Sequence, residues 1–92
     1  MNRERAEQIA LSALIWLSMN EDLLPIFLGA SGASAEDLRA QVGDAGFMAS
    51  VLDFITMDDQ WVIAFCDAEG LKYEQPLQAR YSLTGAENVH WT

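Results

Sequence analysis

The side chains that most often carry catalysis are few in this sequence and lie far apart along it. Cys66 is the only cysteine and His90 is the only histidine. Nucleophilic catalysis needs a thiol or hydroxyl next to a base, and nothing in the sequence brings these two residues together. Cys66 lies inside the apolar run 61–66, where we expect a buried structural thiol, with a redox-sensitive thiol as the alternative. The sequence therefore predicts no catalytic residue, and an enzyme is the less favoured interpretation.

Acidic side chains supply the remaining groups that could do chemistry. A zinc site needs three or four closely spaced Cys, His or carboxylate ligands, which one cysteine and one histidine do not provide. The acids at 58–59 and 67–69 do not fit the calcium-loop pattern, and we interpret them as helix caps and a solvated turn. Asp53 is the one candidate for acid/base chemistry, but we expect it to be solvated or paired with a helix cap. The sequence therefore predicts neither a metal nor a cofactor.

Two patterns could in principle bind phosphate or DNA. A glycine-containing loop at 29–33 leads into a helix N-terminus, but no strand precedes it and no P-loop lysine follows. Two helices predicted to meet at residues 43–44 invite comparison with a helix-turn-helix motif. The stretch 41–71 contains no Lys or Arg, however, so that face would repel phosphates. We expect a plain interhelical loop and no nucleic-acid binding.

The overall charge excludes further classes of binding partner. Fourteen acidic and five basic side chains give a formal net charge of −9 at pH 7. This excess argues against nucleic acid or an anionic membrane as the main partner, because both require clustered Lys and Arg. The longest apolar run of the N-terminal segment, residues 13–17, is far shorter than the roughly 20 residues that cross a bilayer. With no signal-peptide cleavage site and a single cysteine, we expect a cytoplasmic protein.

Caps and glycines in the sequence predict where the first helices lie. The first helix covers residues 6–17, whose apolar side chains recur at three- and four-residue steps. The second is expected over residues 21–28, behind an Asn20 cap. Alternatively, it begins near Leu24, because Pro25 removes one hydrogen bond from a helix interior.

The third and fourth helices are predicted to meet at a corner with almost no loop between them. A capping box at 34–37 opens the third helix, which we expect to bury Leu38 and Val42 and to stop at Gly43. Asp44 then caps the fourth helix, one face of which carries Phe47, Val51, Phe54 and Ile55. This pattern places the fourth helix in the core.

Apolar runs and glycines also predict the last two helices. The segment 60–69 ends at Gly70, and its apolar run suits a strand equally well. No second strand exists to pair with it, so we predict a helix. A sixth short helix is expected over about residues 74–83. The predicted fold class is all-α, a compact single-domain bundle of five or six short helices over residues 1–85, with 86–92 as a C-terminal tail.

Four segments in this order resemble a known family. They are residues 6–17 (AEQIALSALIWL), residues 27–55 (FLGASGASAEDLRAQVGDAGFMASVLDFI), residues 65–71 (FCDAEGL) and the terminal VHWT. Together they resemble a small alphaproteobacterial family catalogued as domain of unknown function 3572, and the central block is the most specific part. The resemblance implies an all-α fold and a bacterial cytosolic setting. It implies no activity and no catalytic residue.

A non-enzymatic module for protein–protein interaction is the leading hypothesis, acting by self-association or on a protein partner. Trp91, His90 and Trp61 are the candidate interface residues, because aromatic side chains are enriched at interfaces. A tryptophan so near the end of a chain must dock on the protein's own core or be offered to a partner.

Two other functions stay open from the sequence. The first is a small-molecule-binding domain or enzyme with a pocket between helices, in which Tyr73, Tyr81 or Asp53 would supply the polar group. The second is an acidic mimic of nucleic acid, which would bind a basic partner through its excess of carboxylates.

Overall fold

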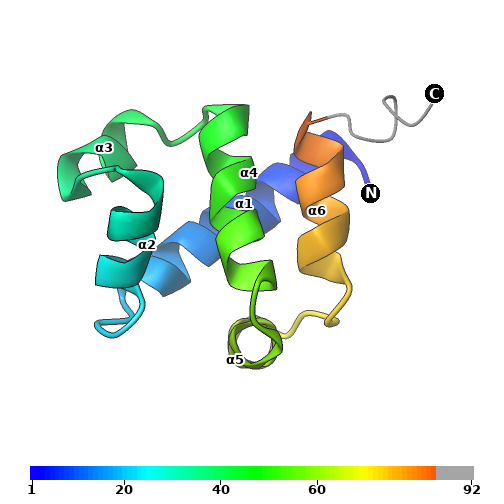
Figure 1. Cartoon of the computed structure of the whole chain (residues 1–92). Helices are drawn as coiled ribbons and strands as arrows, with labels where there is room; N and C mark the ends of the chain where they lie inside the picture. Colours follow the sequence, from blue (N-terminus) through cyan, green and yellow to red (C-terminus); the bar gives the residue numbers. More distant parts are fainter. Residues whose placement is uncertain (85–92) are drawn as a thin grey trace.

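The chain folds into short helices packed around one core (Figure 1). The computed structural model describes residues 1–84, apart from the side chains of residues 35 and 84, and these residues form six α-helices and no strand. The helices are α1 (Arg3–Ser18), α2 (Leu24–Ser31), α3 (Ala35–Ala40), α4 (Ala45–Thr56), α5 (Asp59–Glu69) and α6 (Gln75–Thr84). The predicted all-α fold class is confirmed. No helix within residues 1–84 is long and apolar enough to span a bilayer.

Helix α4 lies at the centre of the fold, with α6 beside it and α1 crossing behind both (Figure 1). Seven side chains of α4 are buried: Phe47, Met48, Ala49, Val51, Leu52, Phe54 and Ile55. Helix α1 contributes a stripe of small side chains, Ala6, Ala10 and Ala13, none of which is exposed. Small buried residues let helix axes approach closely, and α1 packs closely against both α6 and α4.

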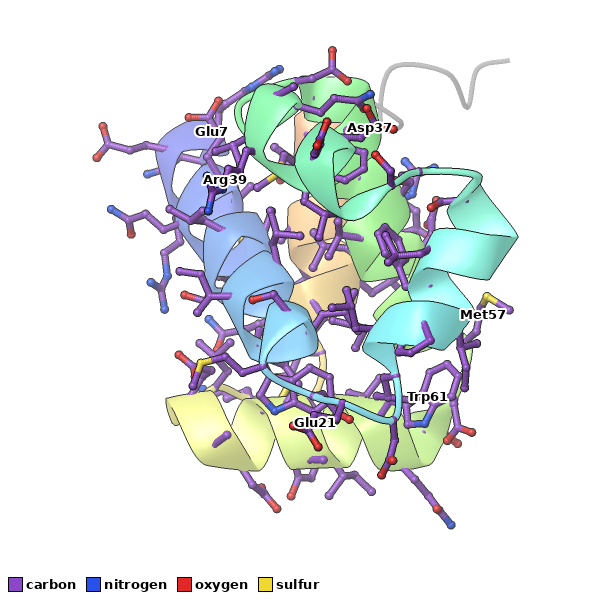
Figure 2. All side chains as sticks on the ribbon, turned by 90° about the vertical axis from the view of Figure 1, so that its left-hand side faces the viewer. Glu7, Glu21, Asp37, Arg39, Met57 and Trp61 are labelled. Carbon is purple, nitrogen blue, oxygen red and sulfur yellow. The ribbon has the colours of Figure 1, made fainter. Side chains whose placement is uncertain are left out.

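The remaining helices cover the two open sides of this core. Helices α2 and α3 lie on the side of α4 that faces away from α6 (Figure 1). Helix α5 lies crosswise beneath the ends of α1 and α4 (Figure 2). It is attached by Phe65, which is fully buried and whose ring centroid lies 5.7 Å from that of Trp16. Charged residues such as Glu7 and Arg39 are exposed at the surface of this assembly (Figure 2).

Most helix ends carry the caps that the sequence predicts. Ser34 and Asp37 form a complete capping box at the start of α3. The side chains of Asp44 and Asp58 accept backbone N–H groups at the starts of α4 and α5. Gly70 ends α5 in the left-handed conformation, with a φ of 71°. These ends depend on local chemistry only, which is why the sequence predicts them.

The region around α2 corrects part of the prediction. The helix begins at Leu24, as the alternative had it, and this puts Pro25 in the first turn, where a missing N–H costs nothing. Asn20 instead caps the preceding turn, accepting the N–H groups of Asp22 and Leu23 at 3.1 Å. The predicted loop 29–33 is wrong at its start, because α2 continues to Ser31 and ends at Gly32, with a φ of 74°.

The corner between α3 and α4 also differs from the prediction. Helix α3 ends at Ala40, three residues before Gly43. The turn that follows carries Val42 away from the core and leaves it 48% exposed, so its predicted burial is wrong. Leu38 is buried, as predicted. Residues 86–92, predicted as a tail, lie outside the described residues, and so do His90 and Trp91.

Candidate functional site

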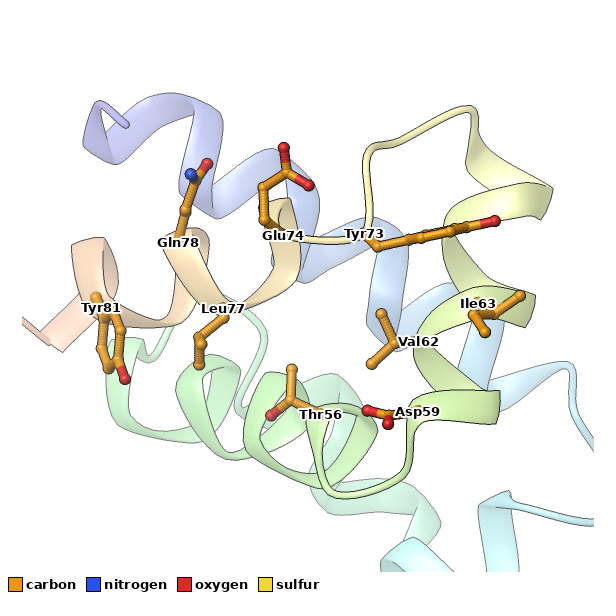
Figure 3. Close-up of a pocket in the computed structure, with 9 residues that line it drawn as sticks. All are labelled: Thr56, Asp59, Val62, Ile63, Tyr73, Glu74, Leu77, Gln78 and Tyr81. Atoms are coloured by element: carbon orange, nitrogen blue, oxygen red, sulfur yellow. The ribbon is translucent and has the colours of Figure 1, made fainter.

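An open groove of about 460 Å³ lies where α5, α6 and the end of α4 meet (Figure 3). We call it the α5–α6 groove. Its lining residues are Thr56, Asp59, Val62, Ile63, Tyr73, Glu74, Leu77, Gln78 and Tyr81. Figure 3 shows Leu77 pointing toward Thr56, while Val62 points from α5 into the same space. The groove is thus bounded by side chains from three separate helices.

The α6 wall of the groove comes from the periodicity of this helix. Pro76, Ala79 and Leu83 face inward and are buried against the core. Leu77 and Tyr81 lie one helical turn apart on a second face of α6, and Tyr73 lies in the turn just before the helix. These three side chains are 43%, 49% and 51% exposed. Helix α6 carries two apolar faces, and only one of them packs on the core.

The α5 wall is positioned by the burial of the neighbouring residues. Phe65 and Cys66 point into the core and are not exposed. Their burial turns Ile63 to the side, where it is 43% exposed, and leaves Val62 partly covered. Asp59 lies one helical turn before Ile63 and lines the same wall.

Tyr73 is fixed at the edge of the groove by a hydrogen bond. Its hydroxyl donates to Oδ1 of Asp67 at 2.8 Å, which links the segment before α6 to α5. This hydrogen bond, together with the negative charge of Asp67, raises the pKa of Tyr73. The ring therefore forms a positioned wall of the groove, and its hydroxyl is already engaged.

The groove has an acidic edge on each side. Asp59 lines it from α5 and Glu74 from the residue just before α6, and no Lys or Arg lines it. Within residues 1–84, neither carboxylate takes part in an ion pair. An apolar floor with a carboxylate on either side can accept an apolar group that is flanked by positive charge.

Cys66 has the environment of a structural thiol. It is fully buried, and its Sγ lies 3.5 Å from the carbonyl oxygen of Lys72, to which the thiol donates. Burial raises the pKa of Cys66, and the charges of Asp67 and Glu74 act in the same direction. The prediction of a buried thiol is confirmed, and the raised pKa disfavours the reactive thiolate that a redox-sensitive cysteine requires.

Other hollows are less suited to be a site. One lies between the end of α1 and α5, beside Trp16, but it is lined by three carboxylates: Glu21, Asp22 and Glu69. Another lies between the N-terminus and α6 and is lined mainly by polar side chains. In the part of the chain that the structure describes, no group of three His, Cys, Asp or Glu side chains is arranged to hold a metal ion.

Comparison with known proteins identifies the family. A family model described as a protein of unknown function (DUF3572) matches residues 3–86. The chain belongs to the DUF3572 family. The match includes all the helices described above and every residue that lines the α5–α6 groove, so the groove lies within the region that defines the DUF3572 family. No curated protein and no solved structure matches the chain.

The structure places the predicted pocket residues of this DUF3572 protein in different positions. Tyr73 and Tyr81 both line the groove, as an interhelical pocket requires. Asp53 does not; it is half exposed, and one of its carboxylate oxygens accepts the Nε–H of Arg80 at 2.6 Å. This pairing of α4 with α6 spans 27 positions of sequence, so spacing along the chain gave no sign of it.

The predicted interface residues are not brought together among the described residues. Trp61 lies at the start of α5 (Figure 2), where its ring stacks on Phe54 with 4.8 Å between centroids. It packs against the core and does not line the groove. Among the large half-exposed side chains of the groove, the sequence analysis missed Ile63 and Leu77, and it also missed the two carboxylates at its edges, Asp59 and Glu74. The available signal was the four-residue spacing of Leu77 and Tyr81 beside the buried positions of α6.

Proposed function

We propose that this DUF3572 protein is a non-enzymatic protein–protein interaction module and that the α5–α6 groove is its contact surface. The observation that carries the proposal is the cluster of four large, half-exposed side chains around one groove: Ile63, Tyr73, Leu77 and Tyr81. Aromatic side chains such as tyrosine are enriched at interfaces, and the buried centre of an interface is more apolar than its rim. The setting that we propose is the cytoplasm of an alphaproteobacterium, as the sequence resemblance implies.

The energy available in the groove indicates what kind of contact it supports. Full burial of a large apolar side chain contributes about 1.5–3 kcal/mol. Because these four side chains are already about half buried, covering them would contribute on the order of 3–6 kcal/mol in total. A micromolar complex needs about 8 kcal/mol after the costs of association. The groove alone therefore supports a weak contact, and a partner must add polar contacts at its edges.

Affinity capture with matched variants tests the proposal. Leu77→Gln removes an apolar side chain from the groove and keeps a good helix former. Leu11→Gln is the control, since Leu11 lies on α1 outside the groove and is 41% exposed, close to the 43% of Leu77. We expect the wild-type protein and the Leu11 variant to retain a partner from native lysate that the Leu77 variant loses. Capture of no partner, or equal loss in both variants, would contradict the proposal.

The three interface residues proposed from the sequence enter the same experiment. Trp91→Ala tests the C-terminal segment, which includes His90 and lies outside the described residues. Trp61→Ala is expected to lower stability as well, because the ring stacks on Phe54. Its capture result is therefore interpreted only alongside a thermal melt.

A small-molecule site is the second candidate. Tyr73 and Tyr81 line the groove, and its volume of about 460 Å³ falls within the range of roughly 300–1,000 Å³ that is typical of ligand pockets. A metabolite that binds the native state would raise the melting temperature, by the equivalent of about 2.7 kcal/mol at a hundred times its Kd. Tyr81→Phe would reduce that shift if its hydroxyl contacts the ligand. A metabolite screen that produces no shift would argue against this candidate.

A further inference from the structure

We propose that the α5–α6 groove binds an amphipathic helix of a partner protein, with Lys or Arg side chains along both edges of its apolar face. This inference rests on the proposed function and adds the chemistry of the partner to it. It follows from the spacing of the apolar side chains and from the position of the carboxylates.

The apolar part of the groove has the geometry of a helix-binding surface. Leu77 and Tyr81 form an apolar row at four-residue spacing on α6, with Tyr73 beside it in the turn before the helix, and rows at this spacing are the ridges that pack against a neighbouring helix. Val62 and Ile63 form the opposite wall on α5. A third helix laid between the two walls would insert side chains at positions i, i+3, i+4 and i+7, as in other helix-in-groove complexes.

The charges determine which helix fits. Asp59 and Glu74 lie on opposite walls and take part in no ion pair within the described part of the chain. The neighbouring acids are already engaged, Asp53 by Arg80 and Asp67 by the hydroxyl of Tyr73. A helix in the groove would therefore meet one available carboxylate on each flank. Lys and Arg suit these positions because their long stems cover apolar surface while their charged ends reach outward.

The same charges disfavour a second copy of this chain. Each copy carries a formal net charge of −9, and dimerisation through the groove would bring Asp59 and Glu74 of both copies toward one surface. Lys72 lies beside Tyr73 in the sequence but does not line the groove, so it does not offset these carboxylates there. Like charges at a shared edge suppress association, whereas opposite charges steer it.

Titration of the full chain with designed peptides tests the inference. The basic probe is a peptide of about 18 residues, five helical turns, built from Leu, Ala and Lys with one apolar face. The acidic probe replaces every Lys with Glu, and the scrambled probe keeps the basic composition but has no apolar face. Chemical shifts of the ¹⁵N-labelled protein report both the affinity and the location of binding. We expect the basic probe to shift amides of α5 and α6 and to bind at least about tenfold more tightly than either other probe.

Variants separate the contributions of charge and of the apolar row. Asp59→Asn and Glu74→Gln should each weaken binding of the basic probe roughly two- to fivefold at low salt, with a smaller effect at high salt. Glu36→Gln is the control, since Glu36 is an exposed acid on α3, and it should change nothing. Leu77→Gln should weaken binding at every salt concentration. Circular dichroism melts verify that each variant is folded.

Several results would overturn the inference. If the acidic probe binds as tightly as the basic probe, charge plays no role, and if the scrambled probe does, the apolar face plays none. Chemical-shift changes centred on α1–α3 would place the site elsewhere. Sedimentation as a dimer that Leu77→Gln dissociates would make a second copy the occupant. Binding of the basic probe only after deletion of residues 86–92 would make the chain's own C-terminal segment the occupant.

The two proposals fail in different ways. If the Leu77-dependent partner is captured but the basic probe does not bind, the interaction module stands and the basic helix is wrong. If the probe binds but no partner is captured, the groove has the proposed chemistry and the proposed function is wrong.

Discussion

Replacing Phe27 with alanine tests how α2 is held on the rest of the fold. Phe27 is 1% exposed and is the one buried residue within the eight residues of α2. Its ring meets the rings of Phe47 and Phe54 at an angle of 70° in both cases, with centroid distances of 6.0 and 5.3 Å. The contact between α2 and α4 therefore depends mainly on this side chain.

The expected loss follows from the side chain that is removed. A buried Phe→Ala substitution costs about 3–5 kcal/mol, of which two edge-on aromatic pairs account for roughly 1–3 kcal/mol. A domain of 92 residues has a free energy of unfolding of about 5–14 kcal/mol. Phe27→Ala should thus remove about a fifth or more of the total stability. Phe27→Leu keeps most of the apolar volume and should cost only about 1–2 kcal/mol.

Urea unfolding and native-state hydrogen exchange measure the two parts of this prediction. The midpoint of unfolding gives the loss of free energy, while exchange shows where the fold opens first. Amides within α2, such as that of Phe27 itself, which bonds to the carbonyl of Leu23, should lose protection before those of α1 and α4. A loss below about 1 kcal/mol with the amides of α2 still protected would show that Phe27 is not the main attachment of this helix.

Four further substitutions test the helix ends, a glycine inside α2 and the buried thiol by urea unfolding. Asp44→Ala removes the acceptor for the N–H of Phe47 at 2.8 Å and should cost about 1 kcal/mol; an unchanged midpoint would show that the cap is dispensable. Gly70→Ala should lower the free energy of unfolding by about 1–2 kcal/mol, because the backbone there is left-handed. Gly29→Ala lies inside a helix with open space beside it and should raise that free energy by about 0.5–1 kcal/mol. Changes of the same sign in both variants would contradict the argument from backbone conformation. Because the pKa of Cys66 is raised in the fold, the native state keeps a proton that the unfolded chain loses, so stability should fall as pH rises above about 9. Cys66→Ala should make that fall shallower, and an identical pH dependence in both proteins would rule out the thiol as its source.

The helix ends were predictable from the sequence because their chemistry is local. A cap such as Asp58 or the box at 34–37 needs a side chain and an amide only two or three positions apart. The left-handed ending of α5 similarly depends on Gly70 alone. Two local signals, Asn20 and Pro25, competed at the start of α2, so the sequence predicted two possible starting points. The observed start at Leu24 is the one that the proline favours.

Features that depend on tertiary packing were not predictable in the same way. Val42 continues the apolar pattern of α3, but the helix ends before it and the following turn exposes it. The ion pair of Asp53 with Arg80 exists because α4 and α6 lie side by side. The apolar periodicity of α4 or of α6 does not indicate which helix packs beside it.

The groove residues also divide into those that the sequence predicted and those that depend on tertiary packing. Tyr73 and Tyr81 were predicted as polar groups of an interhelical pocket because their residue type suggested it, and both line the groove. Ile63 and Leu77 were missed because an apolar residue in a helix is expected to face the core. Whether α6 buries one apolar face or two depends on which helices pack against it, and that is a property of the whole fold.

Site-specific photo-cross-linking in living cells shows whether a partner protein occupies the α5–α6 groove. A photoreactive benzoyl-phenylalanine placed at Leu77 lies in the α5–α6 groove, and the same group placed at Leu11 lies on α1 with similar exposure. We expect a discrete protein adduct from position 77 and none from position 11, with the cross-linked peptide mapping to a basic amphipathic helix. No adduct from position 77, or the same adducts from both positions, would contradict the claim that this groove is the contact surface.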